Sequence, residues 1–363
     1  MRKLKICMFV PFYPIVKGGA EYQSKLIAVK LKEIGHEIIF VSDGLQGGKV
    51  EMIQGFKVFG TYPPSSPIDK LTLYKFYLDF FKKVLTQEKP DIVYQRILNT
   101  YTLRASKISN SLNIPFVLHI ADNYSVEFNG WKGFFKRLMF QQILKAKIDV
   151  ICQTEYQYTR IKGLGEINRN IISNMHPRSM TTIQRKDENL ILWIGNVRPV
   201  KQLEVYIWMA KRLIHTQYKF MIIGDIPKNE YGIQLIAEIE KSCNITYVGQ
   251  RDNKYINEEL AGASLLVNTS ISEGFSNTFI QAWMCGTPVL SLNSDPDGVM
   301  KRYGLGISCS GSKERMLDEI GTILKVSSYE ERSNRIKAIA ENQFSIDRNI
   351  CKIEKIFEEA YNK

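Results

Sequence analysis

The chain has 363 residues, of which 44% are hydrophobic and 24% charged, which is typical of a soluble globular protein with two domains. No apolar run reaches the length of a membrane-spanning helix, which argues against an integral membrane protein. The net charge of +12 lies in the first half, because residues 1–180 contain 26 Lys and Arg against 14 Asp and Glu, whereas residues 181–363 contain 23 of each; this indicates an anionic partner, such as a membrane surface, a lipid diphosphate or a nucleic acid.

The chain opens with a strand over residues 4–10, a loop that contains Gly18 and Gly19, and a helix to about Ile34 that leads to a second strand. A strand, a Gly-rich loop and a helix form the first unit of a parallel nucleotide-binding type of sheet. The two glycines permit close approach of the backbone to a ligand. A plain flexible turn explains them equally well.

Further strand and helix units follow. A helix is expected over residues 69–86, and a turn at residues 89–91 leads into a strand. The next strand is buried and ends near His119, at the carboxyl edge where open α/β sheets bind ligands. A lone histidine is more often a hydrogen-bonded structural residue, and that interpretation stays open. Asp122 is a weaker candidate.

Residues 129–147 interleave aromatic and basic side chains. This pattern suits an interfacial helix that lies on anionic lipid. An ordinary amphipathic helix with a solvated basic face explains the pattern about as well. The residues concerned are Trp131, Lys132, Phe134, Phe135, Lys136, Arg137, Phe140, Lys145 and Lys147.

The polar segment over residues 179–188 is expected to be an interdomain linker. A strand over residues 190–195 follows and leads into a loop with two cations, Arg198 and Lys201. Cations in a strand-to-helix loop could clamp a diphosphate. Solvated loop charges are the commoner alternative.

A second candidate loop lies between a buried strand over residues 264–267 and a helix that begins near Asn277. The loop carries one carboxylate, Glu273, and Gly286 ends the helix. The amide groups and the positive dipole end of the helix suit a phosphate, and Glu273 could accept hydrogen bonds from sugar hydroxyls.

The alternation of strands and helices predicts an α/β protein with two Rossmann-like parallel-sheet domains. We expect a first domain over residues 1–178, the linker, and a second domain over residues 189–345. A final amphipathic helix over residues 346–363 is expected to return to the first domain.

The stretch from Glu273 to Gln281 resembles the E-x7-E signature of the retaining glycosyltransferases of family 4, with Gln281 at the second Glu position. The resemblance implies the GT-B fold, in which two such domains face a cleft. It implies that Glu273 binds hydroxyls of the donor sugar and that Gln281, whose amide can hydrogen-bond a diol, binds the ribose. The implied diphosphate contacts are the backbone groups of Gly274, Phe275, Ser276, Asn277 and Thr278.

The resemblance extends to other loops. It implies that Gly18 and Gly19 approach donor and acceptor, and that His119 lies near the transferred sugar. Lys201 is in register after Gly195 with the family's diphosphate-binding lysine, whereas Arg198 lies two residues beyond the usual arginine position, which here holds Asn196. Gly249 and Arg251 match the turn that holds the nucleotide base.

The resemblance therefore implies a retaining, metal-independent enzyme that needs no cofactor. The expected partners are a nucleotide-sugar donor, with UDP favoured by frequency in the family, and a saccharide or lipid-linked acceptor. We expect a role in bacterial surface polysaccharide synthesis (capsule, exopolysaccharide or O-antigen). The cysteines are scattered and include no close-spaced pair, which suits free thiols in the cytoplasm. We also expect peripheral contact with the cytoplasmic face of the membrane.

Two other classes stay open. A nucleotide-sugar epimerase of the same fold would share the nucleotide site and would act on the donor without an acceptor. A nucleic-acid-binding protein is suggested by charge alone, and the sequence has no recognised nucleic-acid module. We therefore expect no nucleic-acid partner.

Overall fold

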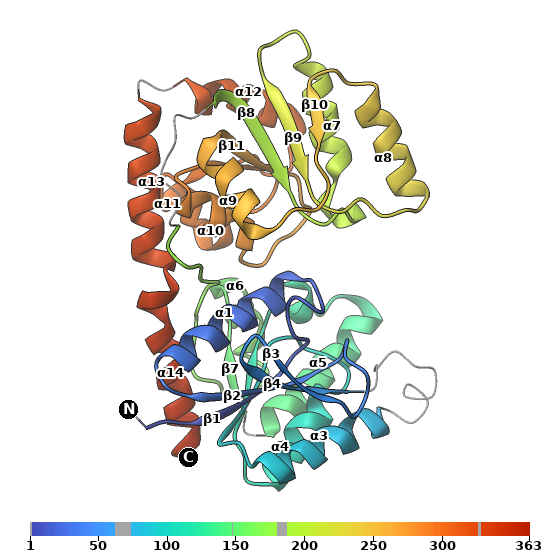
Figure 1. Ribbon diagram of the computed structural model, residues 1–363, viewed down its shortest axis with the longest axis vertical. Coiled ribbons are helices and arrows are strands. Elements are labelled where there is room, and N and C mark those ends of the chain that lie inside the picture. Colours follow the sequence, from blue (N-terminus) through green and yellow to red (C-terminus); the bar gives the residue numbers. More distant parts are fainter. Residues whose placement is uncertain (1, 62–73, 147, 180–186, 326–327) are drawn as a thin grey trace. The chain divides into compact units, whose positions relative to one another are not determined.

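The computed structural model describes residues 2–61, 74–146, 148–179, 187–325 and 328–363 (Figure 1). The chain forms two compact units: unit 1 comprises Met1–Met175 and Ile346–Lys363, and unit 2 comprises His176–Ser345. Most of the expected linker, residues 180–186, falls outside the described residues. A strand already begins at Asp187, two residues before the expected start of the second domain.

Unit 1 is built on a seven-stranded sheet with the order β3-β4-β2-β1-β5-β6-β7. All neighbouring strands are parallel except β3, which is antiparallel to β4. The order reverses between β1 and β5, which makes the carboxyl ends of these two strands a topological switch point. The strands are β1 (Lys5–Phe9), β2 (Glu37–Ser42), β3 (Val50–Ile53), β4 (Phe56–Gly60), β5 (Ile92–Gln95), β6 (Phe116–His119) and β7 (Asp149–Ile151).

Helices cover both faces of this sheet. One core packs the sheet against α3, α4, α5 and α6, and the other packs it against α1 and α14. Helix α3 begins at Lys75, whereas the sequence predicts a start near residue 69; residues 69–73 lie outside the described residues. Among its described residues, the helices of unit 1 are α1 (Gly19–Glu33), α3 (Lys75–Glu88), α4 (Thr102–Ser111), the short η1 (Tyr124–Val126), α5 (Gly130–Lys145), α6 (Glu155–Ile161) and α14 (Ile346–Tyr361).

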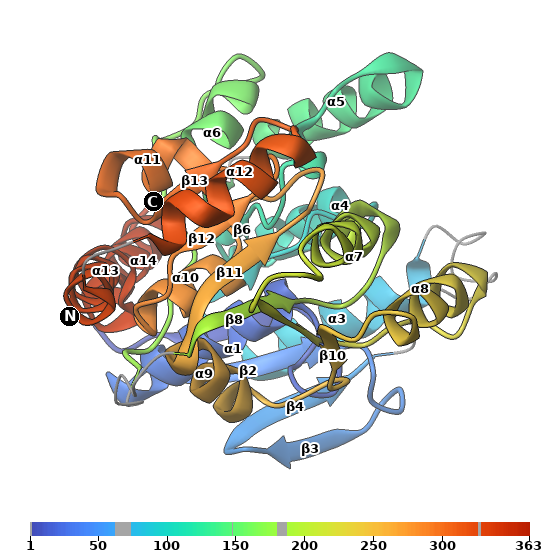
Figure 2. The same ribbon diagram turned by 90° about the horizontal axis from the view of Figure 1, so that it is seen from above.

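The hairpin of β3 and β4 is an element that the sequence analysis does not anticipate. Its two-residue turn, Gln54 and Gly55, has φ values of 51° and 79°. Positive φ at both central residues is typical of a type I′ turn, whose twist matches that of the flanking strands. The hairpin adds an edge strand to the sheet of unit 1 (Figure 2).

Unit 2 has a six-stranded, all-parallel sheet with the order β10-β9-β8-β11-β12-β13. Its switch point lies between β8 and β11. Every residue of β11 is buried, as expected for a parallel strand covered on both faces. The strands are β8 (Asp187–Ile194), β9 (Lys219–Ile223), β10 (Ile245–Tyr247), β11 (Ala263–Asn268), β12 (Val289–Ser291) and β13 (Gly306–Ser308).

The helices of unit 2 again form two layers. Helices α7, α8 and α12 share one core, and α9, α10, α11 and α13 share the other. Gly286, with φ of 74°, follows the end of α10 where the sequence predicts it, close against Ser333 of α13. The helices are η2 (Pro199–Lys201), α7 (Leu203–Arg212), α8 (Glu230–Glu240), α9 (Asn253–Gly262), α10 (Asn277–Met284), η3 (Pro296–Gly298), α11 (Val299–Tyr303), α12 (Lys313–Leu324) and α13 (Tyr329–Phe344).

Candidate functional site

The switch point of unit 2 brings together the two loops that the sequence analysis singles out. Lys201 ends the short helix that follows β8, and Glu273 lies in the loop that follows β11. Because β8 and β11 are adjacent parallel strands, their carboxyl ends meet at one edge of the sheet. Residues 72 positions apart in the sequence therefore come into contact.

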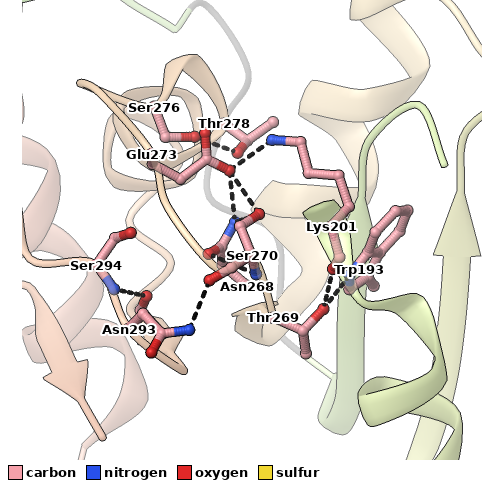
Figure 3. Close-up of polar contacts among 11 residues, drawn as sticks. Trp193, Lys201, Asn268, Thr269, Ser270, Glu273, Ser276, Thr278, Asn293 and Ser294 are labelled. Carbon is pink, nitrogen blue, oxygen red and sulfur yellow. Dashed lines mark hydrogen bonds and ion pairs between the residues drawn. The ribbon is translucent and has the colours of Figure 1, made fainter. Parts of the chain in front are cut away.

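Lys201 and Glu273 form an ion pair, with 2.5 Å between Nζ and Oε1 (Figure 3). Their side chains are 21% and 12% exposed. Two further donors converge on the same carboxylate oxygen: Ser270 Oγ at 2.6 Å and Asn268 Nδ2 at 3.2 Å. Charge-assisted hydrogen bonds of this kind hold a carboxylate in one orientation.

Both loops are tied to the sheet beneath them. Thr269 Oγ1 donates to the carbonyl oxygen of Lys201 at 2.6 Å and accepts from Trp193 Nε1 at 3.0 Å. The amide of Ile271 donates to the carbonyl of Val200 at 2.9 Å. Trp193 is almost fully buried in β8, so these bonds link the ion pair to the core of unit 2.

The ion pair determines the protonation of Glu273. Burial by itself would raise the pKa of this carboxyl group. The charge of Lys201 and hydrogen bonds from Lys201, Ser270 and Asn268 act in the opposite direction and hold the pKa of Glu273 below its ordinary value. Glu273 is therefore an ionised acceptor at neutral pH.

Helix α10 begins four residues after Glu273. Its N-cap residue, Ser276, makes no capping side-chain hydrogen bond among the described residues, and its Oγ lies 2.9 Å from Thr278 Oγ1. Phe275 anchors the loop, with its ring 5.4 Å from that of Phe344 in α13. Gly274, next to Glu273, is partly exposed.

Gln281, at the position where the family signature has its second Glu, is 5% exposed. Its Nε2 donates to Asn257 Oδ1 at 2.9 Å and lies 3.4 Å from Asn253 Oδ1. Both asparagines belong to α9, so the amide group of Gln281 faces α9.

The remaining residues predicted in unit 2 lie on neighbouring loops. Gly195 follows β8 and lies so close to Gly224 that a Cβ on Gly224 would come within 1.8 Å of the Gly195 carbonyl oxygen. Arg198 is exposed, and its guanidinium has no hydrogen bond or ion pair with any described residue. Gly249 has φ of 72°, and the guanidinium of Arg251 lies over the Tyr255 ring, 5.3 Å from its centre.

The residues predicted in unit 1 lie at the carboxyl edge of its sheet. Gly18 is the N-cap of α1 and Gly19 is its first residue. His119 ends β6 and is fully buried. The carboxylate of Asp122 accepts hydrogen bonds from the backbone amide of Ser125, at 2.7 Å, and from its hydroxyl, so Asp122 has a local role at η1.

Sequence reasoning misses the residues that support these groups. It assigns Asn268, Thr269 and Ser270 only to the end of a strand and a polar loop, although their side chains hold Lys201 and Glu273. It does not single out Arg96, although Arg96 contacts His119. The available signal was position, since each of these residues follows a buried strand or ends one.

No group of three or more His, Cys, Asp and Glu residues is arranged to hold a metal ion in the part of the chain that the structure describes. The expectation of metal independence stays a prediction.

Residues 180–349 match the family of glycosyl transferases group 1. The chain is also similar to N-acetyl-alpha-D-glucosaminyl L-malate synthase of Bacillus anthracis, with 20% identity over 382 aligned positions that cover 98% of this chain and 97% of that protein.

Solved structures also resemble this chain over nearly its whole length. Sucrose-phosphate synthase from Thermosynechococcus elongatus has a TM-score of 0.78 at 13% identity, and the match covers 99% of this chain and 100% of that one. A mutant of S. aureus TarM, solved with UDP and alpha-GlcNAc-glycerol, has a TM-score of 0.77 at 14% identity, and the match covers 98% of this chain and 99% of that one. These matches establish the GT-B fold, and residues 180–349 are a glycosyl transferases group 1 domain.

Proposed function

We propose that this chain is a retaining glycosyltransferase of family 4, which moves a sugar from a nucleotide-sugar donor to a saccharide or lipid-linked saccharide acceptor. The observation that carries the proposal is the Lys201–Glu273 ion pair at the switch point of unit 2, beside the start of α10. A cation, a carboxylate and a helix N-terminus together suit a sugar diphosphate.

Each group has a role in this reaction. The donor departs as a nucleoside diphosphate through an oxocarbenium-like state, so negative charge develops on the leaving phosphate. Lys201 and the amides at the start of α10, with Asn277 and Thr278, stabilise that charge. Glu273 accepts hydrogen bonds from sugar hydroxyls, for which its ionised state is suited.

In this proposal the donor binds to unit 2 and the acceptor binds to unit 1. Gly249 and Arg251 receive the base, and Gln281 would contact the ribose only after leaving the asparagines of α9. The acceptor binds to unit 1, near Gly18, Gly19 and His119, where the basic excess of the first half suits a lipid-linked diphosphate.

The donor we favour is a UDP-sugar, and the process is bacterial surface polysaccharide synthesis. The structure of the S. aureus TarM mutant contains UDP and alpha-GlcNAc-glycerol, which supports UDP here only by similarity. Retention and independence of metal belong to the same proposal.

A screen of UDP- and GDP-sugars by thermal shift tests the proposal. We expect at least one nucleotide-sugar to raise the melting temperature, and to do so equally in EDTA. Absence of a shift with every sugar nucleotide would contradict the proposal. Incubation of the stabilising donor alone, followed by product analysis, separates transfer from epimerisation: an epimerised sugar without acceptor would identify an epimerase.

We also propose that unit 1 contacts an anionic membrane surface through α5. An ordinary amphipathic helix would bury its aromatic side chains, yet Trp131 is 72% exposed and Phe135 is 61% exposed. Phe134 and Leu138 are exposed as well, and Arg137 lies among them. Figure 2 shows α5 at the margin of unit 1. Exposed aromatics beside cations suit a lipid interface.

None of the described helices is long and apolar enough to cross a bilayer. The contact that we propose through α5 is peripheral, with the aromatic rings inserted among headgroups and the basic side chains facing lipid phosphates.

Sedimentation with liposomes tests the membrane contact. We expect binding to anionic vesicles that weakens with salt, and a loss of about tenfold in the partition coefficient when Trp131 and Phe135 are both changed to Ser, since each buries a large apolar surface. Ile233→Ser on α8 is the matched control, because Ile233 is exposed to a similar degree, 66%, without the basic neighbours of α5. Equal and negligible binding to neutral and anionic vesicles would contradict the contact.

A further inference from the structure

A buried arginine lies beside His119 at the carboxyl edge of the sheet in unit 1. Arg96 directly follows β5 and is 1% exposed. Its Nη1 lies 3.0 Å from His119 Nδ1 and 3.1 Å from the Tyr94 hydroxyl, and its Nη2 donates to Asn174 Oδ1. The described residues form no salt bridge with Arg96. Its charge also reaches Glu21 of α1: burial raises the pKa of that carboxyl group, and Arg96 acts in the opposite direction.

The chemistry of these groups determines where His119 carries its proton. A guanidinium has donors and no acceptor, so Nδ1 must accept from Arg96 and cannot carry a proton itself. The Tyr94 hydroxyl, 2.8 Å from Nδ1, then faces the same single lone pair as a second donor, while its oxygen accepts from Arg96. A neutral imidazole whose Nδ1 accepts carries its proton on Nε2.

The surroundings also oppose a second proton on His119. Burial and the charge of Arg96 lower the pKa of His119 well below its ordinary value, against a smaller opposing effect of the Ile172 backbone. The Ile172 effect is that of a backbone hydrogen bond of poor geometry, and the buried Nε2 atom has no well-formed hydrogen bond with any described residue. A buried N–H group without a well-formed hydrogen bond is costly, and a bound ligand commonly supplies a better acceptor at such a position.

We propose that Arg96 is a positioning residue that fixes His119 as the neutral tautomer protonated on Nε2, and thereby makes Nε2 a hydrogen-bond donor to an oxygen of the sugar substrate. The identity of the ligand rests on the proposed function, whereas the tautomer does not. His119 then acts as a donor of fixed direction, and not as a general base through Nδ1.

Long-range ¹⁵N NMR of the full chain, labelled at histidine, tests the tautomer. The chain has four histidines, and the spectrum of His119→Gln identifies the His119 signals. We expect the Nε2–H neutral pattern from about pH 5.5 to 8. An Nδ1–H pattern, or an imidazolium at about pH 6, would overturn the proposal.

Two variants distinguish the effect of Arg96 on the His119 tautomer from the effect of Tyr94. In Tyr94→Phe, Arg96 still donates to Nδ1, so the Nε2–H pattern should persist. In Arg96→Met, Nδ1 can take a proton and donate to the Tyr94 hydroxyl, so we expect an Nδ1–H population and proton uptake at higher pH. An unchanged His119 pattern in a folded Arg96→Met protein would show that Arg96 does not fix the tautomer.

His36 provides an internal reference in unit 1. Its Nδ1 accepts from the backbone amide of Leu4 at 3.1 Å, and its Nε2 lies 3.1 Å from Glu354 Oε1. Its signals should be the same in both variants if the fold is intact. Should Arg96→Met fail to fold, the wild-type and Tyr94→Phe spectra decide, because an Nδ1–H pattern in either contradicts the proposal.

Transfer kinetics test the ligand contact. We expect His119→Phe to lower kcat/KM about tenfold, and His119→Gln, which retains an N–H donor, to recover much of that loss. Unchanged kinetics in His119→Phe would remove the substrate contact. Absence of transfer in the wild type, together with the expected spectra, would remove the proposed function while the positioning of His119 stands.

Discussion

Replacing Lys201 tests whether the Lys201–Glu273 ion pair contributes more to activity and stability than an ordinary surface ion pair does. We expect Lys201→Met to lower kcat about a hundredfold, which corresponds to ~3 kcal/mol of lost stabilisation of the leaving phosphate. It should also lower the free energy of unfolding by about 2 kcal/mol, because the Glu273 carboxylate loses its charged partner in a largely buried place. Steady-state kinetics and urea unfolding measure the two effects.

The matched control is Lys219→Met. Lys219 pairs with Asp187 at 2.8 Å, but both side chains are exposed, at 67% and 37%. Such a pair contributes about 0–1 kcal/mol, so stability and kcat should stay close to those of the wild type. Equal losses of activity in the two variants would show that the Lys201–Glu273 pair has no special role.

The lowered pKa of Glu273 predicts how the free energy of unfolding depends on pH. Its pKa is lower in the folded protein than the ordinary 4.5, so its ionised form stabilises the fold at every pH above that value. This contribution is lost as the pH falls through the folded pKa. Wild type should therefore exceed Glu273→Gln in free energy of unfolding by a constant amount between about pH 7 and pH 5.5.

Below about pH 4.5 the difference between wild type and Glu273→Gln should shrink, because the unfolded chain takes up the proton first. Urea unfolding of both proteins across this range measures it. A difference that closes already between about pH 7 and pH 5.5 would mean that the Glu273 pKa is raised and that burial outweighs Lys201.

At the scale of elements, the position of the loop that carries Lys201 depends on the close approach of the chain just after β8 to the chain just after β9. Gly224 has φ of 152°, and a Cβ there would lie 1.8 Å from the carbonyl oxygen of Gly195. Gly224→Ala must therefore push the two loops apart. We expect a loss of about 2 kcal/mol in the free energy of unfolding, together with a rise in KM for the donor.

Gly262→Ala is the control for this change. Gly262 is the last residue of α9, and no atom lies within 4 Å of the position of its new Cβ. Alanine should be neutral there, or stabilising by up to about 1 kcal/mol, because it favours the helix. Thermal melting and donor titration distinguish the two variants; a tolerated Gly224→Ala would show that the Gly195 loop is free to move.

At the scale of the whole molecule, the last helix belongs to the core of the first half of the chain. Helix α14 packs with α1 and the sheet of unit 1, and Phe357 is fully buried with its ring 5.7 Å from that of Tyr94. Phe357→Ala should lower the stability of unit 1 by about 3–5 kcal/mol through the cavity that it leaves.

The four tryptophans distinguish the units, since Trp193, Trp208 and Trp283 lie in unit 2. We expect Phe357→Ala to shift the far-UV circular dichroism transition more than the tryptophan fluorescence transition. Lys355→Ala, on the exposed side of the same helix at 75% exposure, should shift neither. Identical shifts of both signals in Phe357→Ala would mean that the units unfold as one.

Local pattern was sufficient to predict most of the secondary structure. Strand β11, helix α10 and the glycine after it appear where the sequence predicts them, because a parallel strand buried on both faces is a short apolar run and a helix repeats its apolar positions every three to four residues. The β3–β4 hairpin was missed, since its four-residue β3 strand is mostly exposed and has little alternation.

The sequence by itself therefore determined the α/β class of this protein and the loops in which its candidate site lies. Only the tertiary structure decided which side chains meet: Lys201 with Glu273, and Arg96 with His119. The reason is that strand order and register, which depend on packing across the whole sheet, bring the ends of distant strands together. The hydrophobic periodicity of a single segment does not predict that order.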